Sequence, residues 1–134
     1  MRTKILHGLC VLSLFGVLAA CSTHQKSSGF KAQYGTPQQT FETWAEAARR
    51  LDMPLLLSTY AVSARPEAEQ EFNSASPQQL KQMQEEANDT KFTVEQVVFE
   101  GEKAFLRVKR KLENREEIEV ITMMREGQEW KLLP

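Results

Sequence analysis

Apolar residues recur every three or four positions between residues 37 and 87, and every second position from residue 92 onward. A period near 3.6 predicts amphipathic helices, and a period of two predicts half-buried strands. The chain therefore reads as helices first and strands afterwards. In the first helix, over 37–51, the apolar stripe is formed by Phe41, Trp44, Ala45, Ala48 and Leu51.

Start and stop signals bound this first helix. Thr36-Pro37-Gln38-Gln39 supplies a hydroxyl cap, a proline at the first helical position and a glutamine three residues after the cap. At the other end, Asp52-Met53-Pro54 ends the helix and restarts the chain. Asp52 is a suitable cap for a following helix, and Pro54 disfavours helical backbone at Met53.

Three more helices follow in the pattern. The run from Leu55 to Ala61 is apolar enough for a second, buried helix, and the acidic stretch 66–72 suits a short exposed one. Ser76-Pro77-Gln78-Gln79 repeats the start signal, and Asn88-Asp89 closes the helical half.

The strand half begins at Lys91 and contains three turn signals. Gly101-Glu102 is a two-residue hairpin turn, and Gly127 precedes a last short strand around 130–133. The middle turn, at Asn114-Arg115, can hold two or three residues. The two choices place opposite faces of the strand over 118–124 against the core, so this register stays open. In the second strand one face carries Ala104, Leu106, Val108 and Leu112, and the other carries Phe105, Arg107, Lys109 and Lys111.

This order of elements indicates one α+β domain over residues 36–134. Its N-terminal helices are expected to pack on one face of a curved antiparallel meander, in a cone-like arrangement.

Residues 1–20 have the three-part layout of a secretory signal peptide. Arg2 and Lys4 give a positive start, Ile5 to Leu18 is mostly apolar, and small residues follow. The apolar run is shorter than the roughly 20 residues that a membrane-spanning helix needs. A cleaved signal is therefore favoured over a permanent span.

The stretch Leu18-Ala19-Ala20-Cys21 resembles the lipobox of bacterial lipoproteins. The resemblance implies cleavage before Cys21 and acylation of its thiol, which anchors the protein in a membrane. In a diderm bacterium, Ser22 after the cysteine favours the outer membrane, facing the periplasm. Residues 21–35 are small and polar, with His24 among them, and are expected to form a flexible tether from the lipidated cysteine.

Cleavage leaves 114 residues with a net charge of about −3, because Arg2 and Lys4 are removed. This mild acidity predicts no nucleic-acid partner. Cys10 is removed and Cys21 is acylated, so no thiol remains for a disulfide, a metal or a nucleophile. His24 is then the one histidine, so no metal site is expected. The absence of a phosphate loop and of a dinucleotide fingerprint predicts no cofactor.

Beyond the tether, the chain resembles the nuclear-transport-factor-2-like superfamily, a cystatin-like cone fold that includes SnoaL-like domains and small bacterial lipoproteins of unknown role. The resemblance rests on the first helix, on the break RRLDMPLLLSTY over 49–60 and on the ending EGQEWKLL over 126–133. It implies a cone whose enzymes place an acidic residue or histidine beside a tyrosine. Asp52 with Tyr60 is the match to such a pair, and a cap and a core aromatic are the structural alternatives.

A basic run lies on the second strand. It can form a patch for an anionic envelope polymer, or it can pair with the glutamates across the next turn. Cross-strand ion pairs are the favoured interpretation, because the basic residues lie on one strand and the glutamates lie just across the turn on the next. The run comprises Lys103, Arg107, Lys109, Arg110 and Lys111, and the glutamates are Glu113, Glu116, Glu117 and Glu119.

The expected function is a non-enzymatic, lipid-anchored envelope module that contacts a protein partner. An alternative is a binding protein for an apolar small molecule or lipid in the cone, and an isomerase- or dehydratase-like enzyme comes third. Trp44, Phe105 and Met123 meeting in the cone would close it, whereas an empty mouth lined by methionines would support a ligand. The oligomeric state stays open. The methionines concerned are Met53, Met83, Met123 and Met124.

Overall fold

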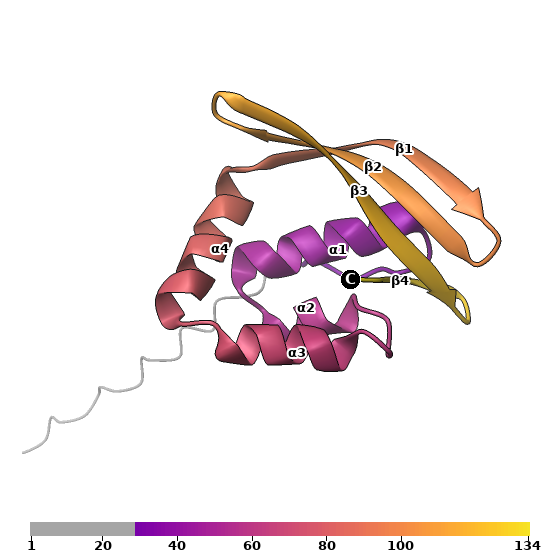
Figure 1. Cartoon of the computed structure of the whole chain (residues 1–134), viewed down its shortest axis with the longest axis horizontal. Coiled ribbons are helices and arrows are strands. Elements are labelled where there is room, and N and C mark those ends of the chain that lie inside the picture. The colour runs from indigo at the N-terminus through magenta and orange to yellow at the C-terminus, as the bar shows by residue number, and fades with distance from the viewer. Residues whose placement is uncertain (1–28) are drawn as a thin grey trace, which may run out of the picture. The chain divides into compact units, whose positions relative to one another are not determined.

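A computed structural model describes residues 29–134, and residues 32–134 form one compact unit. Helices precede strands, which confirms the predicted α+β class (Figure 1). The helices are α1 (Pro37–Arg50), α2 (Met53–Ser58), α3 (Arg65–Ser74) and α4 (Pro77–Asp89). The strands are β1 (Lys91–Glu100), β2 (Lys103–Leu112), β3 (Arg115–Glu126) and β4 (Glu129–Leu132).

The caps of α1 and α2 explain the chain reversal between these two helices. The Thr36 hydroxyl accepts a hydrogen bond from the backbone N–H of Gln39 at 3.2 Å, and α1 ends at Leu51, which adopts φ 55°. The Asp52 carboxylate then accepts from the N–H of Leu55 at 3.1 Å and starts α2. Contrary to expectation, Met53 is helical: Pro54 lies in the first turn, where a helix needs no N–H donor.

The remaining helices follow the predicted signals with one difference. The reciprocal capping box between Ser76 and Gln79 begins α4, and α3 forms over the acidic stretch. The helix α2 stops at Ser58 and is only partly buried, with Leu56 its fully buried side chain. The expected buried helix through Ala61 is therefore shorter and more exposed than its run of leucines suggests.

The strands form an antiparallel meander in the order β1-β2-β3-β4. Gly101 and Gly127 lie in turns, as predicted, and both turns hold two residues, with positive φ at the glycine. The middle turn also holds two residues, Glu113 and Asn114, since Leu112 pairs with Arg115. The turn thus lies one residue earlier than Asn114-Arg115, and this position settles the register that the sequence left open.

A β-bulge at Glu95 shifts the side-chain alternation within β1. Val94 pairs with Val108, but Gln96 pairs with Arg107, so Glu95 is an extra residue on this strand. Such an insertion moves every following side chain to the other face. As a result, Val94 and Val97 both pack against the core, although a regular strand would place residues three positions apart on opposite faces.

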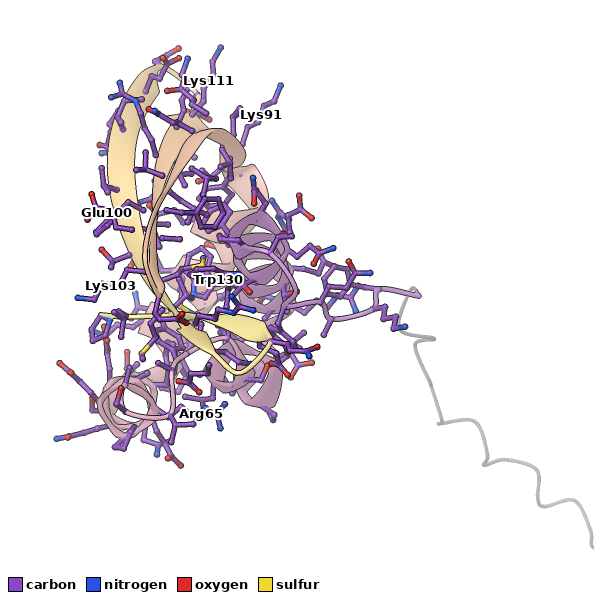
Figure 2. The ribbon with its side chains drawn as sticks, turned by 90° about the vertical axis from the view of Figure 1, so that its right-hand side faces the viewer. Arg65, Lys91, Glu100, Lys103, Lys111 and Trp130 are labelled. Atoms are coloured by element: carbon purple, nitrogen blue, oxygen red, sulfur yellow. The ribbon has the colours of Figure 1, made fainter. Side chains whose placement is uncertain are left out.

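The core lies between the helices and the inner face of the sheet. Ala104, Leu106 and Val108 are fully buried, which confirms their predicted common face on β2. The fully buried Met123 comes from β3, and Trp130 lies between the sheet and the helices (Figure 2). The Thr40 hydroxyl donates to the Trp130 carbonyl oxygen at 2.7 Å and ties α1 to β4.

The folded unit begins before the predicted boundary at residue 36. The backbone N–H of Gln33 donates to the Thr43 hydroxyl at 3.1 Å, and that hydroxyl donates back to the Gln33 carbonyl at 3.0 Å. The Tyr34 carbonyl accepts from the Trp130 N–H at 2.8 Å. Residues 33 and 34 therefore belong to the domain rather than to the tether.

The signal peptide, Cys21 and His24 lie outside the described residues. Within residues 29–134, no helix combines the length and the apolar character that crossing a membrane requires.

Candidate functional site

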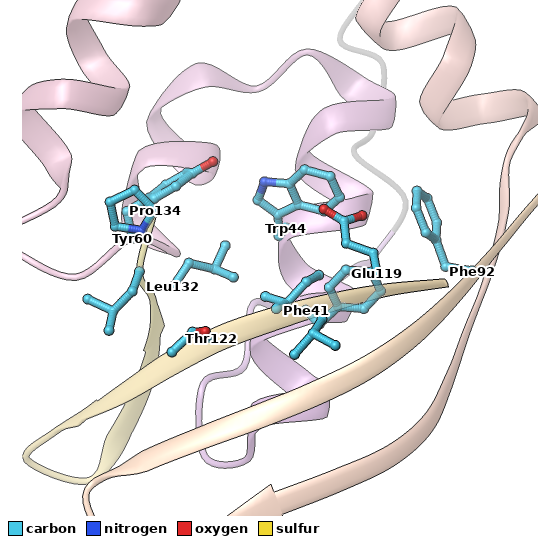
Figure 3. A pocket seen from close by; sticks show the side chains of 11 residues that line it. Phe41, Trp44, Tyr60, Phe92, Glu119, Thr122, Leu132 and Pro134 are labelled. Carbon is cyan, nitrogen blue, oxygen red and sulfur yellow. The ribbon is translucent and has the colours of Figure 1, made fainter. Parts of the chain in front are cut away.

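A cavity of about 240 Å³ opens between α1, the end of α2 and the inner side of the sheet (Figure 3). Its lining combines four aromatic rings with the edge of β3 and the end of the chain after β4. The lining residues are Phe41, Trp44, Tyr60, Phe92, Glu119, Val120, Ile121, Thr122, Leu132, Leu133 and Pro134.

The cavity exists because β4 is much shorter than β3. The pairing of these strands spans only 123–126 of β3, and the Leu133 N–H makes a final bond to the Thr122 carbonyl at 3.0 Å. Beyond that point no further strand in the described chain covers β3. The space between its uncovered edge and α1 is then bounded by side chains of these elements, which do not fill it.

Aromatic rings form the wall of the cavity on the helix side. Phe41 and Trp44 lie one turn apart on α1, with ring centroids 5.7 Å apart and nearly parallel planes. Phe92 meets both rings edge to face, at 5.5 Å from Phe41 and 6.1 Å from Trp44. Edge-to-face and offset contacts of this kind hold rings in fixed orientations, so the wall is preorganised.

Two cations already lie over one of these rings. The guanidinium carbon of Arg49 is 5.9 Å from the Phe92 ring centroid, and that of Arg110 is 5.8 Å from it. Both distances fall within the range of cation–π attraction. Both arginines are also paired with glutamates, Arg49 with Glu46 at 3.6 Å and Arg110 with Glu86 at 3.2 Å, so these glutamates offset their charge.

Tyr60 closes the opposite end of the cavity. Burial raises the pKa of its phenol above the ordinary value of 10.0, and a hydrogen bond with Trp44 partly opposes this shift. Since an indole N–H can only donate, the Tyr60 oxygen accepts from it. The phenol stays neutral at physiological pH and keeps its own proton to donate.

Glu119 brings the one carboxylate side chain among the described residues that line the cavity. It lies on the inner face of β3 opposite Val108, and its carboxylate points between Trp44 and Phe92 (Figure 3). Its oxygen lies 3.6 Å from a guanidinium nitrogen of Arg110, which makes a shorter contact of 3.2 Å with Glu86. The Glu119 side chain is 51% exposed, so it is accessible to a bound molecule.

The structure separates the predicted Asp52 and Tyr60 pair. Tyr60 lines the cavity, whereas Asp52 is exposed, caps α2 and is absent from the lining. Asp52 therefore acts as a helix cap, which was the structural alternative to a catalytic role. Glu119, which was not singled out as a site residue, is the carboxylate side chain of the lining, and it lies beside Trp44 and Phe92 rather than beside Tyr60 (Figure 3).

The side chains expected to decide whether the cone is open do not meet. Trp44 lines the cavity, Met123 is buried in the core, and Phe105 lies on the β2 face opposite Leu106. None of the four methionines lines this cavity, and Met83 instead borders a separate hollow of about 300 Å³ between α3 and α4. The cavity is thus open, but aromatic rather than methionine-lined.

Cross-strand ion pairs engage much of the basic run, as predicted. Lys109 lies 3.1 Å from Glu116 of β3 and 3.3 Å from Glu95 of β1, and Arg107 lies 3.2 Å from Glu95. These bonds lower the pKa of Glu95 and raise that of Lys109. Arg110 pairs with Glu119 on the inner side.

In the part of the chain that the structure describes, no group of three or more His, Cys, Asp or Glu side chains is placed to hold a metal ion. The same residues leave no buried side-chain nitrogen or oxygen without a hydrogen-bond partner.

Comparisons with known proteins show a structural likeness. No family model matches the chain, and no curated protein matches it significantly. A crystal structure at 1.27 Å resolution, described as an NTF2-like protein of unknown function from Cytophaga hutchinsonii, is similar with a TM-score of 0.43 and 12% identity. The match covers 76% of this chain and 88% of that protein.

Proposed function

We propose that this chain is a lipid-anchored protein of the bacterial cell envelope whose domain binds a small molecule with apolar groups in the cavity without transforming it. The observation that supports binding is the open cavity of about 240 Å³ walled by Phe41, Trp44, Tyr60 and Phe92. Concave, largely apolar sites with a few convergent polar groups are typical of small-molecule binding.

Anchoring rests on the lipobox-like sequence at Cys21. Its test is the intact mass of the mature protein from native membranes, compared with a Cys21→Ser variant. We expect the wild-type mass to equal residues 21–134 plus acyl groups, and the variant to lack these groups. An uncleaved or unmodified wild-type chain would remove the anchor from the proposal.

Binding is tested with cyclohexanol, a neutral and soluble ring compound, by following the indole N–H resonances of the two tryptophans. We expect cyclohexanol to shift the Trp44 resonance saturably and to leave that of Trp130 unchanged, because Trp130 lies outside the lining. Ile121→Trp should fill the cavity and abolish the shift. Ile118→Trp is the matched control on the opposite face of β3, where Ile118 is 45% exposed.

No shift at Trp44 in the wild-type protein, or an equal shift in the Ile121→Trp variant, would contradict ligand binding in the cavity. Since overpacking costs about 1–3 kcal/mol, the variant spectra must first show a folded domain.

A second candidate function is contact with an envelope protein through the outer face of the sheet. Val98, Ile118 and Val120 are exposed apolar side chains on this face, and Val120 is 63% exposed. Clustered exposed apolar side chains mark interaction surfaces. A photo-crosslinker at Val98, which lies outside the cavity lining, should give a discrete product in native membranes, and one at Gln128 in the last hairpin turn serves as the control.

A further inference from the structure

The lining of the cavity contains few ionisable side chains. Among the described lining residues, the ionisable side chains are those of Glu119 and Tyr60. The described lining includes no lysine, arginine or histidine. Because the phenol of Tyr60 stays neutral, the charged side chain of the lining is the Glu119 carboxylate, and the Arg110 guanidinium lies 3.6 Å from it outside the lining. An anionic ligand would be repelled, whereas a cationic group would be attracted.

Glu119 is only loosely held by its own partner. Its 3.6 Å separation from Arg110 exceeds the length of a strong charge-assisted hydrogen bond, while Arg110 donates to Glu86 at 3.2 Å. The carboxylate thus keeps acceptor capacity for a bound group. Its position between Trp44 and Phe92 places this negative charge beside the aromatic wall (Figure 3).

The aromatic wall suits the same kind of ligand. A cation within about 6 Å of a ring centroid is attracted by the negative face of the ring, most strongly for tryptophan. Arg49 and Arg110 show that Phe92 already takes part in such contacts. Trp44 and Tyr60 line the interior together with Glu119, so three groups that stabilise a cation converge on one space.

From this convergence we propose that the ligand is a small organic cation with apolar substituents, such as an alkylated ammonium compound. The proposal rests on the proposed binding function and specifies its ligand class. The ammonium group lies near Glu119 and the indole of Trp44, and its alkyl groups contact the rings. An alkylated ammonium is weakly hydrated, so entering an aromatic cavity costs it less than it would cost a primary amine.

The test compares choline with 3,3-dimethylbutan-1-ol, its neutral analogue in which a carbon atom replaces the nitrogen. The full chain, isotope-labelled and purified in a maltoside detergent without choline headgroups, is titrated with each compound. The Trp44 indole N–H resonance reports binding, and the Trp130 resonance is the internal control. We expect choline to bind about tenfold more tightly than the alcohol, from the cation–π and carboxylate contacts together.

Glu119→Gln removes the charge and keeps the shape of the side chain. We expect it to weaken choline binding about fivefold to tenfold while the affinity for the alcohol stays the same. Glu117→Gln is the matched control, because Glu117 lies on the same face of the same strand but outside the cavity lining.

The outcomes separate the two levels of the proposal. Equal affinities for choline and the alcohol would overturn the cationic ligand class and leave cavity binding intact. If choline, the alcohol and cyclohexanol all leave the Trp44 resonance unshifted, both cavity binding and the cationic ligand class are overturned. A preference for choline that survives Glu119→Gln unchanged would contradict the role of Glu119.

Discussion

The ammonium nitrogen of Lys131 lies 3.8 Å from the centroid of the Tyr34 ring. The same nitrogen donates to the Ser58 carbonyl at 2.8 Å and lies 2.7 Å from a carboxylate oxygen of Glu129. The Tyr34 hydroxyl is in turn 2.6 Å from the Ser58 hydroxyl oxygen. One buried cation therefore joins the segment before α1, the end of α2 and β4.

Replacing Lys131 with methionine should lower the free energy of unfolding by about 1–3 kcal/mol. Methionine keeps much of the apolar stem but leaves the Ser58 carbonyl without its donor and removes the contact with Tyr34. Urea denaturation measures the change. Lys111→Met, at an exposed lysine of β2, should stay within about 0.5 kcal/mol of the wild type. Equal effects at both positions would contradict the role assigned to Lys131.

Thr40→Val tests the bond between α1 and β4. Valine has the shape of threonine without its hydroxyl, and this hydroxyl is fully buried and donates to the Trp130 carbonyl at 2.7 Å. We expect a loss of about 1–2 kcal/mol in thermal or urea unfolding. Thr93→Val, at an exposed position of β1, is the control and should be nearly neutral or slightly stabilising.

The middle hairpin turn carries backbone strain that can be relieved. Glu113 adopts φ 44°, in the left-handed region that disfavours side chains other than glycine and asparagine. Glu113→Gly should raise the free energy of unfolding by about 0.5–1 kcal/mol. Gly101→Ala should have the opposite sign, since Gly101 adopts φ 59° in the first hairpin turn. A destabilised Glu113→Gly variant would show that the turn carries no such strain.

The raised pKa of Tyr60 leads us to expect that stability depends on pH. Because burial raises the pKa of Tyr60 in the folded state, the folded chain holds this proton more tightly than the unfolded chain. Its contribution to stability is complete below the ordinary pKa of 10.0 and is lost as the pH rises through the folded-state pKa. The difference in unfolding free energy between wild type and Tyr60→Phe should therefore shrink in this alkaline range. A difference that is independent of pH would contradict the shift.

Much of the fold could be predicted from local signals. The caps at Thr36, Asp52 and Ser76 are each formed by side chains that bond within their own turn, so the sequence near them determines the helix starts. The alternation on β2 likewise identified its buried face. Pro54 was misjudged, because the preference of the residue before a proline is weaker than the stability of a capped first turn.

The candidate site was less accessible to sequence reasoning. Glu119 faces the cavity only because the middle turn holds two residues; a three-residue turn would place it on the outer face. The charged sequence around it gave no means of choosing between the turns. The bulge at Glu95 was missed for a similar reason, since the residues on both sides of it are compatible with either face.

The meander leaves two strands with free backbone groups, along β1 and along β3 between residues 115 and 121 of the described chain. Such edges invite pairing with other chains and can start aggregation. The bulge at Glu95 distorts the first edge, and a row of charges guards the second: Arg115, Glu116, Glu117 and Glu119. Glu119 thus lies both in the lining of the proposed ligand site and on the unpaired edge of β3. Variants that neutralise this row would be expected to lower solubility before they alter the fold.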